Sequence, residues 1–174
     1  MTNKNQLNNK QESSLYNSIV LLSRNKLFYT KFNLADTFQN RIHLIFIHIS
    51  FLFIKIKTDK NNQIFKNFYQ RMFDLLFKNI EHNMREIGHG DVLINKNMKI
   101  LVKTFYNILL NCEKYKTKNI ASKSMFLTKY IDIKTSLNAE NMNNLIDYFD
   151  KYDSFCVDLS LDSVLKGKIN FNYK

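Results

Sequence analysis

A pair of glycines in the middle of the sequence, in Gly88-His89-Gly90-Asp91, separates two long stretches whose apolar residues recur at helical spacing. Before the glycines the apolar residues recur every four positions: Ile64, Phe68, Met72, Leu76, Ile80 and Met84. After the glycines they are spaced by four and three in alternation: Ile94, Met98, Leu101, Phe105, Ile108, Cys112 and Tyr115. Each pattern places one apolar stripe along a helix, and such a stripe is normally buried against neighbouring elements. Because the chain contains no proline, we expect long helices packed in a bundle, with a coiled coil as the alternative.

Weaker patterns extend the helical prediction over most of the remaining chain. A first helix is expected from about Ser13 to Tyr29, with Leu15, Ile19, Leu22 and Lys26 along its buried side. A second helix should begin after Asp36, whose carboxylate is a candidate N-cap, and end near Lys57. Two further helices are expected over residues 123–131 and 139–152.

The C-terminal residues follow a different pattern, in which apolar and polar side chains alternate as is typical of extended chain. The alternating apolar residues are Phe155, Val157, Leu159 and Leu161, and then Ile169, Phe171 and Tyr173. The sequence therefore predicts an all-α protein, a compact bundle of about five to six helices with a short irregular or extended C-terminal tail. We expect a flexible N-terminal segment at 1–12, a helical domain at 13–153 and the tail at 154–174.

The most apolar run, Ile42 to Ile54, is 13 residues long. A helix that spans a membrane needs about 20 apolar residues, so this run is too short. It is apolar all around a helical wheel, which favours a central core helix over a helix that lies against a membrane surface.

The net charge of +11 is unevenly distributed along the chain. Residues 1–57 carry 8 basic and 2 acidic side chains, and residues 91–134 carry 9 basic and 3 acidic, so each region has a net charge of +6. Lys96, Lys99 and Lys103 share one helical face, opposite the apolar stripe. This face is either an ordinary solvated surface or a docking surface for phosphate or lipid headgroups.

No set of residues predicts catalysis or metal binding. Cys112 and Cys156 match no metal-binding spacing, so we expect reduced, buried thiols. His43 and His48 are five residues apart, which is about 140° around a helix and prevents them from sharing a metal ion. A phosphate-binding glycine loop, a zinc-protease motif and a nucleophile elbow are all missing. We therefore expect a binding protein that is not an enzyme, with no metal site and no cofactor.

A specific group of residues surrounds the glycine pair and extends along much of the chain. It begins with Met84-Arg85-Glu86-Ile87-Gly88-His89-Gly90-Asp91 and continues with Asn95-Lys96, Lys99, Phe105-Tyr106 and Tyr115. Upstream it includes Leu15-Tyr16, Ile19-Val20, Arg24, Phe28-Tyr29, Asp36-Thr37, Arg41, His48 and Phe73-Asp74. In order and spacing these residues resemble the ubiquinol–cytochrome c chaperone family, from about Leu15 to Tyr115.

This resemblance implies an all-helical assembly factor without catalytic activity. Members of the family bind newly made cytochrome b and help it reach the ubiquinol–cytochrome c reductase complex, which is respiratory complex III. Mitochondrial members work with a small partner protein and associate with the ribosome near its exit tunnel. We expect the same client here, with the ribosome, a small partner protein and an anionic membrane surface as further partners. The N-terminus shows no targeting signal, so the expected location is the cytoplasm, at the inner face of a bacterial cytoplasmic membrane, with the mitochondrial matrix as the alternative.

The glycine turn and the helix that follows it contain the candidate site residues. For partner binding we expect Arg85, Glu86, His89, Lys96, Lys99, Lys103 and Tyr106. Gly88 and Gly90 should supply the backbone freedom of the turn, Asp91 should accept amides in it, and Arg85 and Glu86 should pair locally. The alternative function, which rests on the three lysines, is a basic helical protein that binds RNA or the ribosome.

Overall fold

The computed structural model describes residues 2–57, 62–134 and 139–173, with side chains for 10–57, 66–134 and 139–173. Over these residues the helices are α1 (Thr2–Ser23), α2 (Lys26–Thr30), α3 (Phe38–Lys57), α4 (Asn62–Glu86), α5 (Asp91–Glu113), α6 (Ile120–Tyr130), α7 (Ala139–Asp158) and α8 (Leu161–Leu165), with a 3₁₀ turn η1 at Tyr115–Thr117. Within this part of the chain six helices have 11 residues or more, and the only β-type pairing is an isolated bridge between Leu34 and Ile133. The predicted all-α bundle is therefore confirmed.

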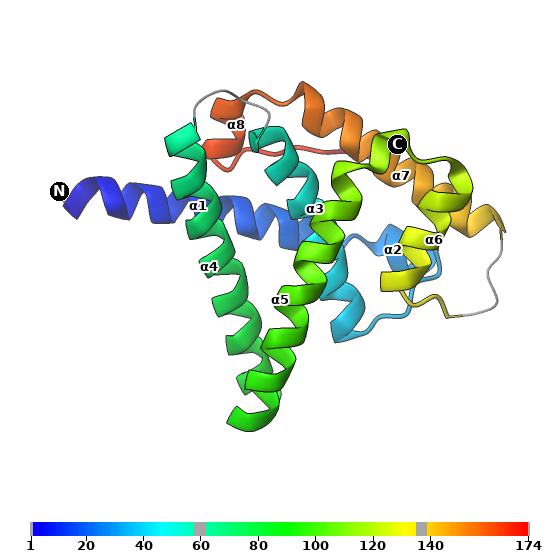
Figure 1. Cartoon of the computed structure of the whole chain (residues 1–174), viewed down its shortest axis with the longest axis horizontal. Helices are drawn as coiled ribbons and strands as arrows, with labels where there is room; N and C mark the ends of the chain where they lie inside the picture. Colours follow the sequence, from blue (N-terminus) through cyan, green and yellow to red (C-terminus); the bar gives the residue numbers. More distant parts are fainter. Residues whose placement is uncertain (1, 58–61, 135–138, 174) are drawn as a thin grey trace.

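The central element is α3, which packs against α1, α4, α5 and α7 (Figure 1). Every residue from Ile42 to Phe53 is buried, as expected for a helix that is apolar on all sides. The core prediction for this run is confirmed, and attachment to a membrane through this helix is wrong because its surface is already covered by the other helices. A search of the described residues finds no helix with the length and apolarity needed to cross a bilayer.

Four polar residues of α3 are buried with hydrogen-bond partners: Asn40, His43, His48 and Ser50. The amide Nδ2 of Asn40 donates to the carbonyls of Ala35, at 2.7 Å, and Asp132, at 2.8 Å, and its Oδ1 accepts from the Asp132 amide at 2.9 Å. Asn40 thereby joins the loop before α3 to the segment after α6. His48 contacts the Leu44 carbonyl through Nδ1, at 2.6 Å, and the Tyr148 hydroxyl on α7 through Nε2, at 2.9 Å.

The helices on either side of the glycine pair have the predicted stripes. On α4 the residues Phe68, Met72, Leu76, Ile80 and Met84 are buried, while Ile64 lies outside the described side chains. On α5 the buried residues are Ile94, Leu101, Phe105, Ile108 and Cys112, and Tyr115 continues the stripe into η1. Met98, also predicted for this stripe, is partly buried against the core. These helices do not form a coiled coil, which was the alternative, because both stripes pack against α3 in the bundle.

At the N-terminus the helical boundaries differ from the prediction. The helix begins at Thr2 instead of near Ser13, and it ends at Ser23 instead of continuing to Tyr29, because Asn25 starts a separate short helix. Glu12, assigned to a flexible segment, is 3% exposed and forms an ion pair with Arg71 of α4. Packing against α3 and α4 thus holds at least this part of the segment in place.

The C-terminal tail is partly helical, so the predicted extended segment at Phe155 to Leu161 is wrong. Helix α7 runs through the predicted boundary to Asp158, and α8 follows at Leu161–Leu165. The residues after α8 lack regular structure, and their rings pack on α7: Phe171 lies 5.4 Å from Tyr148 between ring centroids.

Gly167 closes this tail onto α1. Its φ is +70°, and a Cβ at this position would lie 2.7 Å from the Gln11 carbonyl oxygen and 2.8 Å from the Leu15 nitrogen. Only glycine permits both this backbone conformation and this close approach.

The N-cap of α3 is Thr37 instead of Asp36. The Thr37 hydroxyl accepts the Asn40 amide at 3.1 Å, whereas the Asp36 carboxylate is held by two hydrogen bonds from Arg41, at 2.7 and 2.9 Å. The arginine lies one turn into the helix and draws the carboxylate away from the helix end, because a bidentate guanidinium pair is stronger than a hydrogen bond to one amide.

Candidate functional site

The glycine turn lies at the tip of an arm that α4 and α5 form below the rest of the bundle (Figure 1). Gly88 has φ of +89°, which ends α4 and allows the chain to reverse. Gly90 is the N-cap of α5 with φ of −76° and ψ of 159°, a conformation open to any residue. The structure thus requires glycine at Gly88 for conformational reasons and does not require it at Gly90.

Arg85 connects the two sides of this turn. Its guanidinium donates to Glu81 on α4 at 2.9 Å and to Asp91 on α5 at 2.6 Å. The predicted local pair with Glu86 is wrong, since Glu86 lies 3.3 Å from His82 instead. The predicted role of Asp91 as an amide acceptor is also wrong, because no side chain caps the first turn of α5 and the Asp91 carboxylate faces Arg85.

His89 is half-buried in the turn. Its Nδ1 is shielded from solvent and has no hydrogen-bond partner among the described residues. Next to it Ile87 is 57% exposed and Val92 is 86% exposed. The tip therefore presents apolar side chains together with one imidazole.

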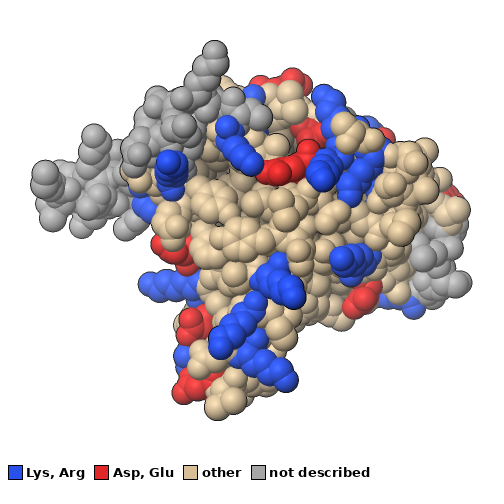
Figure 2. Space-filling view, in the orientation of Figure 1, with Lys and Arg blue, Asp and Glu red and all other residues tan. Residues whose placement is uncertain are grey.

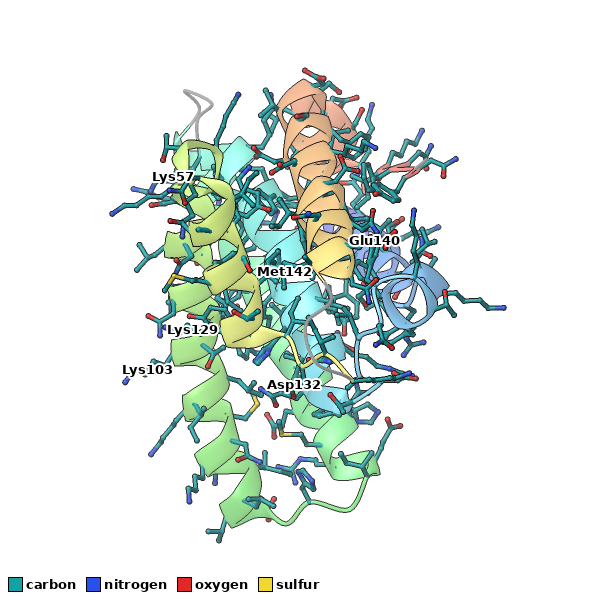
Figure 3. The ribbon with its side chains drawn as sticks, turned by 90° about the vertical axis from the view of Figure 1, so that its right-hand side faces the viewer. Lys57, Lys103, Lys129, Asp132, Glu140 and Met142 are labelled. Carbon is teal, nitrogen blue, oxygen red and sulfur yellow. The ribbon has the colours of Figure 1, made fainter. Side chains whose placement is uncertain are left out.

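The outward side of α5 carries the other candidate residues. Lys96, Lys99 and Lys103 are exposed, and Tyr106 is 44% exposed. None of the three lysines forms an ion pair with a described carboxylate. Lys103 projects away from the bundle (Figure 3), and Figure 2 shows basic side chains over the lower part of α5, set in uncharged surface.

Apolar side chains on the same surface were not identified from the sequence. Val92, Ile100 and Leu110 are 86%, 53% and 58% exposed. Positions 92, 96, 99, 103, 106 and 110 follow one another by four and three, so lysines and apolar residues share one helical face. We call these side chains, together with Ile100 beside them, the α5 face. The same spacing test that located the buried stripe would have revealed it.

One edge of the α5 face continues into a row of aromatic rings between α4 and α5. The ring of Tyr106 lies 5.9 Å from that of Phe73, which in turn stacks on Tyr69 at 6.4 Å and 15°. Tyr69 contacts Phe53 of α3 at 4.4 Å. Burial, with a further contribution from the neighbouring Tyr106 hydroxyl, raises the pKa of Tyr69 well above its usual value, so this phenol remains neutral.

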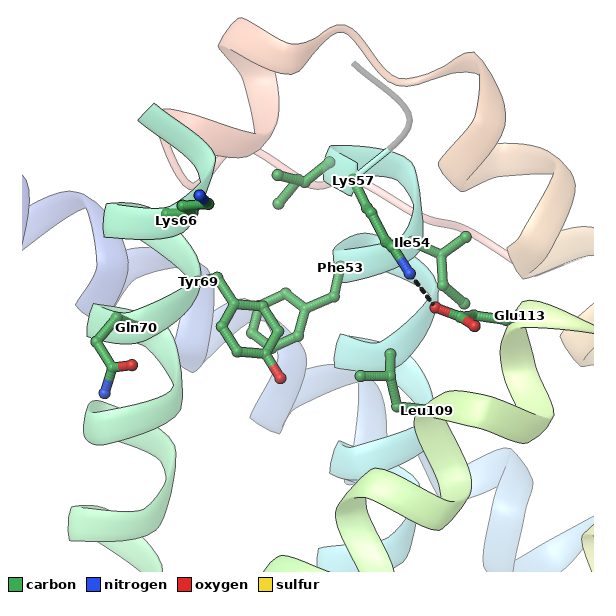
Figure 4. A pocket seen from close by; sticks show the side chains of 9 residues that line it. Phe53, Ile54, Lys57, Lys66, Tyr69, Gln70, Leu109 and Glu113 are labelled. Carbon is green, nitrogen blue, oxygen red and sulfur yellow. Dashed lines mark hydrogen bonds and ion pairs between the residues drawn. The ribbon is translucent and has the colours of Figure 1, made fainter. Parts of the chain in front are cut away.

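A pocket of about 490 Å³ lies at the upper end of the aromatic row, where α3, α4 and α5 meet (Figure 4). Its apolar lining comes from Phe53, Ile54, Ile56, Tyr69 and Leu109, and its polar lining from Lys57, Lys66, Gln70 and Glu113. Lys57 and Glu113 form an ion pair at 2.7 Å across one side. The lining suits an apolar group and offers no pair of groups arranged for acid–base or nucleophilic catalysis.

The remaining cysteines and histidines of the described core are not arranged as a reactive or metal-binding site. Cys112 and Cys156 are both buried free thiols, as predicted, and burial raises the pKa of each. His43 and His48 have separate partners, the Tyr130 carbonyl and the Tyr148 hydroxyl. Among the described residues no group of three or more His, Cys, Asp or Glu side chains could hold a metal ion.

Three comparisons place these features among known proteins. The model of the ubiquinol–cytochrome c chaperone family matches residues 30–171, which extends the resemblance seen in the sequence well beyond Tyr115. The crystal structure of the Cbp3 homolog from Brucella abortus is similar with a TM-score of 0.82 and 24% sequence identity, over 99% of this chain and 94% of that chain. At this identity the likeness shows a shared fold. A search of curated proteins gives no significant match.

The family match includes the glycine turn, the α5 face and the pocket, and it covers most of the chain. The protein therefore belongs to the ubiquinol–cytochrome c chaperone family.

Proposed function

We propose that this protein is a non-catalytic assembly factor that binds newly made cytochrome b and promotes assembly of ubiquinol–cytochrome c reductase. Family membership supports a chaperone role in the assembly of this complex. The choice of cytochrome b as the client is the further step, and it rests on the surface that the α5 face presents.

The observation that carries the proposal is the mixture of exposed apolar and basic side chains on the α5 face. Val92, Ile100 and Leu110 contribute the apolar part, and the three lysines between them are not neutralised by described carboxylates. Large exposed apolar surfaces are uncommon on proteins that act alone, and they mark sites of protein contact. A client with apolar membrane helices can cover such residues, while the lysines keep the uncovered surface hydrated.

The experiment replaces the apolar residues of the α5 face. The triple variant Val92→Ser/Ile100→Ser/Leu110→Ser should bind cytochrome b roughly a hundredfold more weakly than the wild type, because each of the three apolar groups contributes about 1 kcal/mol when it is covered. Assembled complex III should fall accordingly when the variant is the only copy.

A matched control removes three exposed apolar residues from other helices, Leu21→Ser, Met125→Ser and Val157→Ser, which are 71%, 73% and 49% exposed in the wild type. This control should capture cytochrome b normally. Equal capture by the α5 variant and the control, or normal levels of complex III in cells that lack the gene, would contradict the proposal.

The alternative function, binding to RNA or the ribosome, is favoured by one observation, the three exposed lysines without described acidic partners. Replacement of Lys96, Lys99 and Lys103 by Glu should abolish cosedimentation with ribosomes at low salt if this is the main role, since phosphate contacts are lost and replaced by repulsion. Unchanged cosedimentation would remove this alternative. The two triple variants separate the functions, because one leaves the charges intact and the other leaves the apolar residues intact.

The same surface is where we place a small partner protein, if one accompanies the chaperone. We also propose that the protein works at the inner face of the bacterial cytoplasmic membrane, or in the mitochondrial matrix in the alternative setting. Identification of the proteins that copurify with the tagged wild type and with each triple variant tests the partner, and fractionation of the same cells tests the location.

A further inference from the structure

A small basic pocket lies where α1 bends into α2 and meets the loop before α3. It has a volume of about 430 Å³ and is lined by Arg24, Lys26, Tyr29, Thr30, Asp36 and Arg41. Four of these residues, Arg24, Tyr29, Asp36 and Arg41, are among those that carry the family resemblance in the sequence. In the view of Figure 3, α2 lies on the side of the molecule opposite α5, so the pocket is separate from the α5 face.

Local hydrogen bonds fix the walls of this pocket. Helix α1 ends at Ser23, and the Asn25 side chain caps α2 by accepting the Leu27 amide at 3.0 Å. The Tyr29 hydroxyl donates to the Ser23 carbonyl at 3.0 Å, which ties α2 back to the end of α1. This bend places Arg24 and Lys26, both exposed, at the edge of the same pocket.

The pocket has an excess of positive charge. Its lining holds three cationic side chains and one carboxylate, and that carboxylate, Asp36, is bound by Nε and Nη2 of Arg41. Hydrogen bonds from Arg41 lower the pKa of Asp36, and the charge of Lys134 nearby lowers it further. Neither Arg24 nor Lys26 forms an ion pair with a described carboxylate. Two positive charges therefore remain without an acidic partner in a concave site.

We propose that this pocket binds a phosphate group, carried either by the headgroup of a membrane lipid or by a small soluble phosphate ester. A phosphate offers several acceptor oxygens and one to two negative charges, which match Arg24 and Lys26, the two cations of the lining without an acidic partner. A single carboxylate is a poorer match, since one arginine is enough to satisfy it, as Asp36 shows. The inference does not depend on the identity of the client.

The test follows backbone amides of the isotope-labelled full-length protein by NMR during titration with inorganic phosphate, with glycerol 3-phosphate and with acetate. Saturable shifts are expected for the amides around Asn25 to Thr30 with both phosphates, and weaker shifts with acetate. In parallel, cosedimentation is measured with vesicles of phosphatidylcholine alone and with vesicles that contain phosphatidylglycerol.

The double variant Arg24→Gln/Lys26→Gln should weaken phosphate binding by roughly tenfold or more, because two charge-assisted contacts are lost. The double variant Lys99→Gln/Lys103→Gln removes the same charge from the α5 face and should bind phosphate as the wild type does.

If the soluble phosphates bind and the Arg24/Lys26 variant weakens this binding, the proposal is supported and a soluble ester carries the phosphate group. Binding that depends on the pocket and occurs only with phosphatidylglycerol vesicles supports it with a lipid headgroup as the source. The proposal would be overturned if neither the soluble phosphates nor the phosphatidylglycerol vesicles bind. It would also be overturned if the amide shifts are confined to α5, or if the Arg24/Lys26 variant and the wild type bind equally. Captured cytochrome b can be measured on the same variants, so failure here is distinct from failure of the proposed function.

Discussion

Mild acid should destabilise the folded protein in part through His48. Its side chain is 0% exposed, and burial lowers its pKa from 6.5 to about 4, although the hydrogen bond to the Leu44 carbonyl opposes this shift. A carbonyl only accepts, so Nδ1 carries the proton, and Nε2 is the acceptor for the Tyr148 hydroxyl. Protonation of Nε2 would remove this acceptor and place a charge among the rings of Phe28, Phe149 and Tyr152.

The size of the effect follows from the two pKa values. In the unfolded chain His48 takes up a proton near pH 6.5, whereas in the folded protein it does so only near 4, so the unfolded state binds more protons between these values. Stability is therefore fully present above pH 6.5 and is lost as the pH falls toward 4. At about 1.4 kcal/mol per pKa unit, the whole loss is about 3 kcal/mol, of which about 2 kcal/mol has occurred at pH 5. That is a large fraction of the stability of a typical domain.

The assay is urea unfolding followed by far-UV circular dichroism at pH 7.5 and pH 5. The wild type should lose about 2 kcal/mol of unfolding free energy between the two conditions through His48. In the variant His48→Gln this part of the pH dependence should disappear, because a glutamine amide does not titrate. The variant will be less stable than the wild type at pH 7.5, so the pH dependence is the quantity compared.

Other groups contribute equally to both proteins and cancel in the comparison. Burial also lowers the pKa of His43, and it raises that of Asp153, which acts in the opposite direction. Asp36 and Asp147 have pKa values below 3.8 and lose their contribution only in stronger acid. An equal loss of stability in the wild type and in His48→Gln between pH 7.5 and pH 5 would refute the assignment to His48.

Five further substitutions test the local arguments by urea unfolding. Gly88→Ala should lower the free energy of unfolding by about 1–2 kcal/mol because φ is +89°. Gly90→Ser should be neutral or slightly stabilising, since Gly90 already has an N-cap conformation with open space around it. Equal losses for the two variants would contradict this difference between the glycines. Asn40→Ala should cost about 3 kcal/mol, because three hydrogen bonds are lost in a buried site; a loss below about 1 kcal/mol would show that water replaces them. Thr37→Ala should lower the free energy of unfolding by about 1 kcal/mol, which is more than the loss expected for Asp36→Ala. A larger loss for Asp36→Ala would show that Asp36 is the N-cap.

The helices of the arm could be predicted from the sequence because their apolar spacing alone defines a buried stripe. The tail could not, because four alternating residues fit a strand and a helix equally well. In the C-terminal part of α7 the buried residues are Tyr152 and Cys156, and Leu159 follows them, at spacings of four and three, whereas Val157 is 49% exposed. Contact with α3 continues the helix beyond the predicted end.

Two acidic residues expected to accept backbone amides show what local patterns leave out. Asp36 and Asp91 each precede or begin a helix, yet each is bound by an arginine from a neighbouring turn, Arg41 or Arg85. Their partners depend on how the loops fold back, which spacing in the sequence does not reveal. The same is true of the basic pocket, whose residues come from the link between α1 and α2, from α2, from the loop after α2 and from α3.

The close packing of Gly167 against Gln11 and Leu15 joins parts of the chain that are made at very different times. During synthesis α1 emerges early, and the surface of α1 that α8 later covers stays open until almost all of the described chain has been made. Contacts between such distant positions form late and slow the approach to the native state. Ribosome-bound chains truncated before α8 should therefore be cleaved by protease within α1, in a region that the complete protein shields.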